Sequence, residues 1–310
     1  MKIAIAGAGA MGSRFGFMLT DAGHTVNFID PWKEHVEKIN QEGLLVETEN
    51  TSKYYKIPSF LPNEVVDKDY ELIILFTKAM QLEGMLKQIQ GILTENTALL
   101  VLSNGLGNIE TIEEYAGNSA IYAGVTLWSC ELEGPAHIRA TGSGNVEFQP
   151  VKEKNAAMTE ELLTLLNQAK LNAEISQNVV LSIWKKAAFN SVLNTYCALL
   201  DCNVGQFGSS DQAMALSEVV VNEFVAVATA KNVPLTADMV LATVKKVFDP
   251  EQSGDHFPSM HQDITKRRKT EIDYLNGAVV KMGASLNIPV PANQLLTALI
   301  HEKEDILKIK

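Results

Sequence analysis

The sequence predicts an α/β protein, with an N-terminal Rossmann-type, doubly wound parallel sheet followed by a mostly α-helical C-terminal domain. Up to residue 149, short apolar runs alternate with helical apolar periodicity, which is typical of strands buried on both faces of a parallel sheet. From 156 onward only the helical periodicity continues. The charged segment PVKEKN at 150–155 separates the two patterns. We therefore expect domains at 1–153 and 154–310.

Composition excludes several classes of protein. The 310 residues are 46% hydrophobic and carry a net charge of −11, whereas a nucleic-acid partner requires a basic surface. No apolar run is long enough to predict a membrane span. The three cysteines form no C-x-x-C pair, which favours free thiols in a reducing compartment. We expect a cytoplasmic protein that binds neither nucleic acid nor membrane.

A glycine turn near the N-terminus predicts a dinucleotide site. The apolar run Lys2–Ala6 reads as a buried strand, and a helical rhythm starts at Ser13. Between them, glycines at 7, 9 and 12 have the G-x-G-x-x-G spacing that permits a tight turn, lets a pyrophosphate approach, and packs a helix on a strand. The residues expected to bind cofactor here are Gly7, Ala8, Gly9, Ala10, Met11 and Gly12.

Acidic and polar residues follow the next strands. Asp30 ends the strand 25–29, at about the 20-residue distance expected of a carboxylate that binds the adenosine ribose. Lys78 follows the strand 71–76, and Asn104 follows 98–103. Because ligands bind at the carboxyl ends of parallel strands, their shared position favours a site. Taken singly, Asp30 is also compatible with a turn residue, Lys78 with a solvated lysine, and Asn104 with a plain Asn-Gly turn.

Polar residues form a stripe on one helix of the second half. Lys186, Asn190 and Asn194 stand at i, i+4 and i+8, which aligns them on one face of an otherwise apolar helix. The stripe is either solvated or lines a cleft with an amine and two amides. The helices expected in this half are 156–170, 178–200, 211–231, 236–248, 270–287 and 292–308.

A second polar cluster lies at 259–276. Glu271 is expected near the start of a helix, where an acid is favourable against the helix dipole. The basic run 266–269 is expected to be a solvated turn that also attracts anions. His256 and His261 have no metal-ligand spacing with acids or cysteines, so no metal is expected.

Five separated motifs resemble the ketopantoate reductase (2-dehydropantoate 2-reductase) family over nearly the whole chain. They are GAGAMG at 7–12, FTKAMQ at 76–81, SNGLGNIE at 103–110, WKKAAFNSVLN at 184–194 and PSMHQDITKRRKTEIDYLNG at 258–277. The resemblance implies that Lys186 is the general acid, that Glu271 hydrogen-bonds in the active site, and that Lys78 lies on the cofactor side. It also implies substrate or nicotinamide contacts for four residues: Asn104, Asn190, Asn194 and Ser259.

The chain departs from the family pattern after its second strand. Many family members prefer NADPH and carry a basic residue there, whereas Asp30 would bind both ribose hydroxyls of NAD and repel a 2′-phosphate. Val204 also stands where many members carry a pocket amide. We therefore expect NAD rather than NADP, and reduction of C3-branched 2-keto acids to D-2-hydroxy acids, as in the D-mandelate dehydrogenase branch. A homodimer is expected.

Other functions fit part of the sequence. One is an NADPH-dependent 2-dehydropantoate 2-reductase of pantothenate biosynthesis. A non-catalytic NAD-sensing regulator would use the first domain alone and leave the Lys186 stripe unexplained. The glycine fingerprint by itself also fits an FAD protein, and a β-hydroxyacid dehydrogenase would share the two-domain plan.

Overall fold

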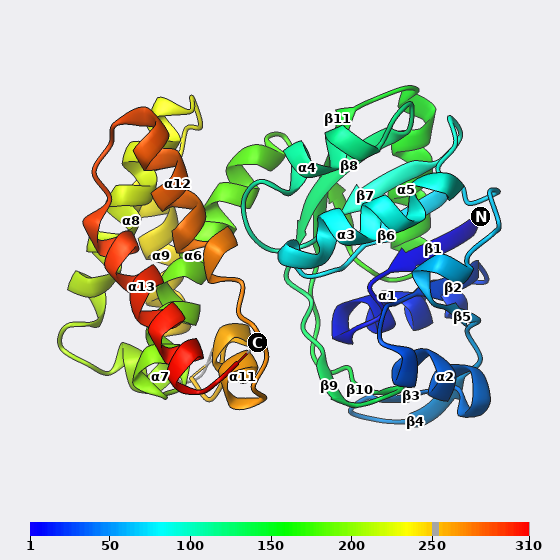
Figure 1. Cartoon of the computed structure of the whole chain (residues 1–310), viewed down its shortest axis with the longest axis horizontal. Coiled ribbons are helices and arrows are strands. Elements are labelled where there is room, and N and C mark those ends of the chain that lie inside the picture. Colours follow the sequence, from blue (N-terminus) through cyan, green and yellow to red (C-terminus); the bar gives the residue numbers. More distant parts are fainter. Residues whose placement is uncertain (250–253, 310) are drawn as a thin grey trace. The chain divides into compact units, whose positions relative to one another are not determined.

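The computed structural model describes residues 1–249 and 254–309, and it divides into two compact units. The first, called the sheet unit, comprises Met1–Ser103 and Asn108–Val179. The second, called the helical unit, comprises Asn104–Gly107 and Val180–Lys310. The predicted fold class, a Rossmann-type sheet followed by helices, is confirmed (Figure 1).

The sheet unit is built on eight strands in the order β12-β11-β8-β7-β6-β1-β2-β5. β1 (Lys2–Ala6) lies between β2 (Thr25–Ile29) and β6 (Leu72–Leu75), parallel to both. The chain adds strands first on one side of β1 and then on the other, so the order reverses at β1. The other five strands are β5 (Ser59–Phe60), β7 (Ala98–Val101), β8 (Ala120–Thr126), β11 (Val146–Lys152) and β12 (Ala173–Ile175). Only the β8–β11 pairing is antiparallel among the described pairs of this sheet.

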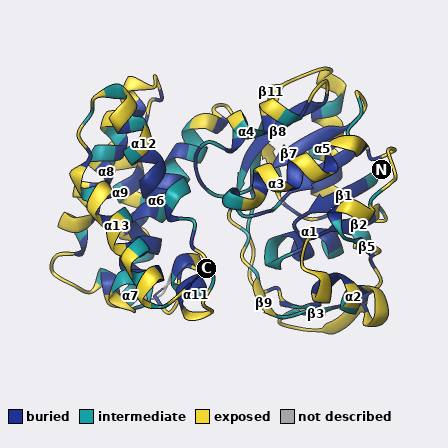
Figure 2. Cartoon of the chain, in the orientation of Figure 1, coloured by how far each residue is buried: buried dark blue, intermediate teal, exposed yellow. Residues whose placement is uncertain are grey.

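Helices pack on this sheet because its strands alternate their side chains between two faces. Ile3 and Ile5 share an apolar cluster with Phe15 and Leu166, which come from two different helices, whereas Ala4 points to the opposite face. The helices of the unit are α1 (Ala10–Asp21), α2 (Lys33–Glu42), α3 (Ala79–Ile89), α4 (Asn108–Tyr115) and α5 (Ala156–Gln168), with 3-10 turns η1 (Pro62–Glu64) and η2 (Gln90–Ile92). Figure 2 shows the buried strands beneath exposed helix surfaces.

A second, four-stranded sheet has the order β4-β3-β10-β9. Its strands are β3 (Leu44–Glu47), β4 (Ser52–Tyr55), β9 (Glu131–Gly134) and β10 (His137–Arg139). The chain turns between β9 and β10 at residues 135–136. The strands on either side were not predicted, because β10 is fixed by parallel pairing with β3, far away in the sequence.

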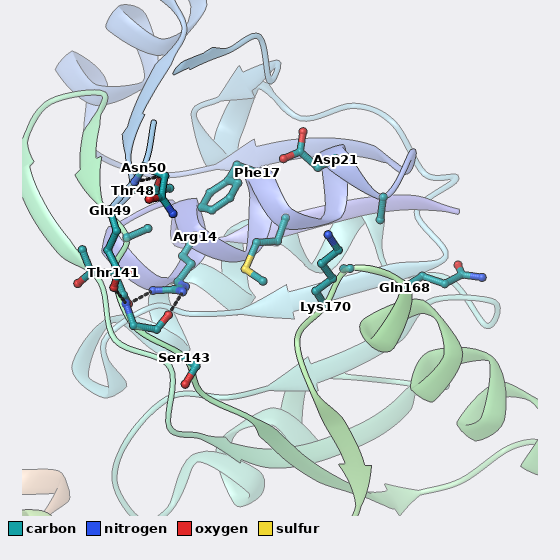
Figure 3. Close-up of a pocket in the computed structure, with 15 residues that line it drawn as sticks. Arg14, Phe17, Asp21, Thr48, Glu49, Asn50, Thr141, Ser143, Gln168 and Lys170 are labelled. Atoms are coloured by element: carbon teal, nitrogen blue, oxygen red, sulfur yellow. Dashed lines mark hydrogen bonds between the residues drawn. The ribbon is translucent and has the colours of Figure 1, made fainter. Parts of the chain in front are cut away.

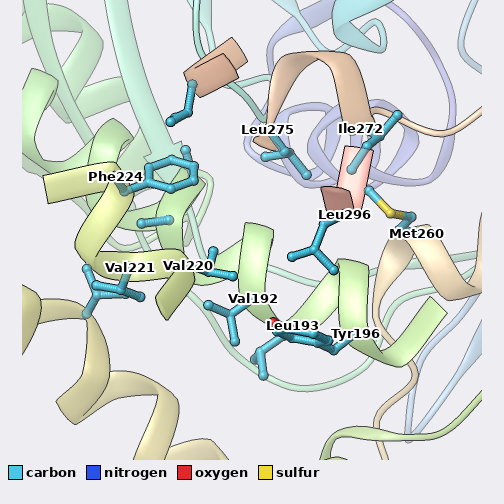
Figure 4. Packing of buried hydrophobic residues seen from close by; sticks show 14 of the residues in the cluster. Val192, Leu193, Tyr196, Val220, Val221, Phe224, Met260, Ile272, Leu275 and Leu296 are labelled. Atoms are coloured by element: carbon cyan, nitrogen blue, oxygen red, sulfur yellow. The ribbon is translucent and has the colours of Figure 1, made fainter. Parts of the chain in front are cut away.

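The described part of the helical unit contains no strand. Its helices are α6 (Val179–Leu200, whose first residue belongs to the sheet unit), α7 (Val204–Gly208), α8 (Ala213–Ala230), α9 (Ala237–Val247), α11 (Ser259–Thr265), α12 (Asn276–Leu286) and α13 (Pro291–Ile306), with the 3-10 turn η3 (Ile272–Tyr274). In its core, Val192 of α6 meets Val220 and Phe224 of α8, together with Leu296 of α13 (Figure 4).

Several boundaries differ from the predictions. The compact units part near Val179 rather than after 153, because β12 pairs with β11 and so keeps α5 in the sheet unit. The helix predicted at 270–287 is broken, since Leu275 has φ −111° and ψ −105° and separates η3 from α12. The short helices α7 and α11 were not predicted.

Helix α8 is the one described helix long and apolar enough to cross a membrane by composition alone. Its residues Val220, Val221 and Phe224 are fully buried in the helical unit (Figure 4). We therefore interpret α8 as a core helix.

Candidate functional site

The register of the parallel strands brings the predicted cofactor residues to one edge of the sheet. Ala6 pairs with both Ile29 and Leu75, so Gly7, Asp30 and the segment leading to Lys78 all follow at the same level. Gly7 N–H donates to the Ile29 carbonyl at 2.8 Å. This edge lies at the point where strand order reverses, which is where open α/β sheets bind ligands.

Glycine is favoured at the three positions of the turn for different physical reasons. Gly7 has φ +96°, and a Cβ there would lie 2.6 Å from the nitrogen of Thr77. A Cβ on Gly12 would lie 1.9 Å from the carbonyl oxygen of Gly7. At Gly9, by contrast, a Cβ would meet nothing within 4 Å. Packing accounts for Gly7 and Gly12, whereas the open space at Gly9 fits a group that approaches the main chain from outside.

Helix α1 starts at this open space. Gly9 is its N-cap, no side chain of the described residues caps it, and its first turn contains no acid. The first N–H groups of α1, from Ala10 to Gly12, therefore suit an anion, whose charge the helix dipole also favours. This chemistry fits the pyrophosphate of a dinucleotide.

Asp30 is held by the main chain. It is 8% exposed, and its two carboxylate oxygens accept the N–H of Ala8 at 2.7 Å and the N–H of Trp32 at 2.8 Å. Burial raises the pKa of Asp30, and the two N–H donors oppose that effect. Each oxygen retains further lone-pair capacity for a ribose hydroxyl. Asp30 thus supports the turn as well as standing where a ribose carboxylate is expected.

The other two predicted strand-end residues fall in different units. Lys78 is the N-cap of α3 and is partly exposed in the sheet unit. Asn104 is partly exposed in the segment 104–107, which groups with the helical unit. There the N–H of Leu106 donates to the carbonyl oxygen of Tyr274 at 2.8 Å, which anchors the segment next to η3.

The predicted stripe on α6 is present in the helical unit. Lys186 and Asn190 are partly buried, and Asn194 is 6% exposed. Burial lowers the pKa of Lys186 to about 8, while the charge of Glu271 acts in the opposite direction. The structure therefore brings Lys186 and Glu271 together. A lysine with a pKa near neutrality is suited to proton transfer.

Ser259 lies at the start of α11 and contacts the same stripe. Asn194 Nδ2 donates to Ser259 Oγ at 3.2 Å. Ser259 is exposed, so its hydroxyl remains accessible from the surface of the helical unit. Two residues on, His261 Nε2 lies 2.8 Å from an oxygen of Asp201, which ties α11 to the residue that follows α6.

A buried amide network behind α6 was missed by the sequence analysis. Asn276 accepts from Thr195 Oγ1 at 2.8 Å and donates to Asn293 Oδ1 at 3.0 Å. Asn293 in turn donates to Glu223 at 2.7 Å. The network joins α6, α12, α13 and α8. The one available signal was Asn276 itself, inside the motif quoted at 258–277.

A cavity of about 630 Å³ in the sheet unit contains none of the predicted site residues (Figure 3). One face of α1, including Arg14, Phe17 and Asp21, lines this cavity. Arg14 is buried, and its guanidinium donates to the carbonyls of Ser129, Thr141 and Gly142. Arg14 therefore braces the loop after β10. No cluster of metal-ligating side chains occurs in 1–249 or 254–309.

Comparison with known proteins gives the same family over both halves of the chain. The family model "Ketopantoate reductase PanE/ApbA" matches residues 3–153, and "Ketopantoate reductase PanE/ApbA C terminal" matches 178–304. A 2-dehydropantoate 2-reductase of Lactococcus lactis subsp. lactis (strain IL1403) is 42% identical, with all of both chains covered. Another, from Streptococcus pyogenes serotype M1, is 39% identical at the same coverage.

A solved structure leads to a different enzyme name. The ternary structure of a D-mandelate dehydrogenase with NADH and anilino(oxo)acetate has a TM-score of 0.97 and 43% identity, with all of both chains covered. These similar proteins are named as oxidoreductases that act on CH–OH groups. On the full-length family match and the shared fold, the chain belongs to the ketopantoate reductase family.

Proposed function

We propose that the chain is an NAD-dependent reductase of C3-branched 2-keto acids that forms D-2-hydroxy acids, like the D-mandelate dehydrogenases of its family. The observation that carries the cofactor assignment is Asp30, a buried carboxylate anchored by two N–H groups at the end of β2. A carboxylate in this position favours ribose hydroxyls and opposes a 2′-phosphate. The similar D-mandelate dehydrogenase structure holds NADH.

The residues of the helical unit support the chemistry. When bound, the dinucleotide supplies the hydride. Lys186, as the ammonium, hydrogen-bonds the substrate carbonyl oxygen and donates its proton as alkoxide character develops. Glu271 keeps the ammonium charged against burial. Ser259 and the amides of Asn190, Asn194 and Asn104 provide polar contacts for the substrate, and Lys78 supports the cofactor.

The test is reduction of benzoylformate with NADH, followed by chiral analysis of the product. The proposal expects NADH oxidation and D-mandelate in equal amounts. Binding of NADH without turnover of any 2-keto acid would instead support the regulator alternative. Reduction confined to 3-keto acids would indicate a β-hydroxyacid dehydrogenase.

A second candidate, the NADPH-dependent 2-dehydropantoate 2-reductase, is favoured by the names of the similar Lactococcus and Streptococcus proteins. The same assay with 2-dehydropantoate and NADPH separates the two. The homodimer and the cytoplasmic location stay predictions, and light scattering of the purified protein checks the former.

A further inference from the structure

His35 is a fully buried residue of α2 whose two ring nitrogens both contact the main chain. The N–H of Ala136 donates to Nδ1 at 3.0 Å, and Nε2 lies 2.9 Å from the carbonyl oxygen of Ala8. Because an amide N–H only donates, Nδ1 is the unprotonated nitrogen and Nε2–H donates to Ala8. The two contacts therefore require one tautomer of the neutral imidazole.

Ala8 lies between the first two glycines of the turn, and it is held from several sides. Its N–H donates to Asp30 Oδ2 at 2.7 Å. Its carbonyl accepts from Ser13 Oγ at 2.6 Å as well as from His35. These contacts fix the peptide groups on both sides of Ala8, and thereby the direction in which the open position Gly9 presents its main chain.

Trp32 links the same imidazole to the ribose end of the expected site. Its indole stacks on His35, with ring centroids 5.0 Å apart and 12° between the planes. Its N–H donates to Asp30 Oδ1 at 2.8 Å. Trp32 is 38% exposed, so the stacked pair reaches the protein surface next to this carboxylate.

We propose that His35 is a positioning residue for the dinucleotide, whose Nε2–H holds the glycine turn in its binding orientation. The ring also fastens this turn to Ala136, between β9 and β10 of the second sheet, and supports Trp32 beside Asp30. The proposal rests on dinucleotide binding by this chain. It differs from a plain core role, since it assigns the function to one hydrogen bond, the one to Ala8.

Two substitutions separate the hydrogen bonds of the ring. In His35→Gln, the longer side chain places an N–H at the height of Nε2, so the donor to Ala8 is kept. In His35→Asn, the oxygen lies at the height of Nδ1, so the acceptor for Ala136 is kept and the donor to Ala8 is lost. His24→Gln is the matched control, because His24 is a partly buried histidine of the same unit whose Nε2 has no described partner.

The measurement is the dissociation constant for NADH by calorimetry, with kcat at saturating NADH and thermal midpoints of the unliganded variants. We expect His35→Asn to weaken NADH binding about tenfold and His35→Gln about threefold or less. The reason is that the side-chain donor to the Ala8 carbonyl is lost only in His35→Asn. The kcat at saturating NADH should stay unchanged in both, and His24→Gln should bind as the wild type does.

Three results would overturn the inference. They are equal NADH affinity in wild type and His35→Asn, weaker binding in His35→Gln than in His35→Asn, and losses of affinity that only follow the thermal midpoints of the two variants. Failure of the wild-type protein to bind NADH is a different outcome, since it contradicts the proposed function itself.

Discussion

The charge of Glu271 acts on the buried amine of Lys186 and opposes the effect of burial, which leaves the pKa of Lys186 at about 8. Burial alone would favour the neutral amine, which has no proton to donate to a developing alkoxide. The pair therefore sets the pH range in which the proposed proton donor is charged.

The pH dependence of keto-acid reduction follows from this pair. The proposed donor is the ammonium form, so kcat/KM should be constant below pH 8 and fall as the pH rises through about 8. In Glu271→Gln the negative charge that raises the lysine pKa is gone, so the fall should begin at lower pH. Initial rates of the wild type and of Glu271→Gln across this pH range check both expectations. The same pH profile in the two proteins would contradict the effect of Glu271 on the pKa of Lys186.

Removal of the amine tests the role of Lys186 directly. We expect Lys186→Ala to lower kcat by about 10²- to 10⁴-fold, the usual contribution of a general acid. Lys185→Ala is the matched control, because Lys185 is the neighbouring lysine of α6 and lies outside the stripe. Near-normal turnover by a folded Lys186→Ala protein would contradict the proposed role of Lys186 as proton donor.

Asp30→Asn tests the cofactor assignment. The amide keeps a similar shape and loses the negative charge, so NADH binding should weaken by about tenfold or more while the preference over NADPH narrows. Glu34→Gln, at an exposed acid of α2, serves as the control for net charge. Dissociation constants for both cofactors give the answer. An unchanged ratio of the two constants would show that Asp30 only supports the turn.

Ser259→Ala tests the substrate side. The exposed hydroxyl accepts from Asn194 and is proposed to contact the keto acid, so its loss should raise KM for the keto acid by about three- to tenfold and leave KM for NADH unchanged. Ser285→Ala, on the exposed side of α12, is the control. A rise confined to the KM for NADH would place Ser259 elsewhere.

The buried network behind α6 is expected to matter for stability. Asn276→Ala removes the acceptor of Thr195 Oγ1 and the donor to Asn293 Oδ1, and the free energy of unfolding should fall by about 2–3 kcal/mol. Denaturant unfolding measures this fall. Thr243→Ala, at a partly exposed residue of α9, should change it by less than about 0.5 kcal/mol. Equal stability of the two variants would contradict the role of the network.

The parts of the fold that depend on local pattern could be predicted from the sequence. Continuous apolar runs and the glycine spacing located β1, β2 and the turn between β1 and α1, and helical spacing aligned Lys186 with Asn190 and Asn194. The parts that depend on distant contacts could not. One partner of His35 is Ala136, 101 residues away, and β10 pairs in parallel with β3, which lies far away in the sequence. The break at Leu275 likewise has no local signal.

The central claim is best tested by initial rates with NADH and NADPH, each against benzoylformate, 2-ketoisovalerate and 2-dehydropantoate. We expect strong preference for NADH, with benzoylformate or 2-ketoisovalerate reduced most efficiently. Preference for NADPH, with 2-dehydropantoate reduced most efficiently, would contradict it and show that Asp30 does not select the cofactor.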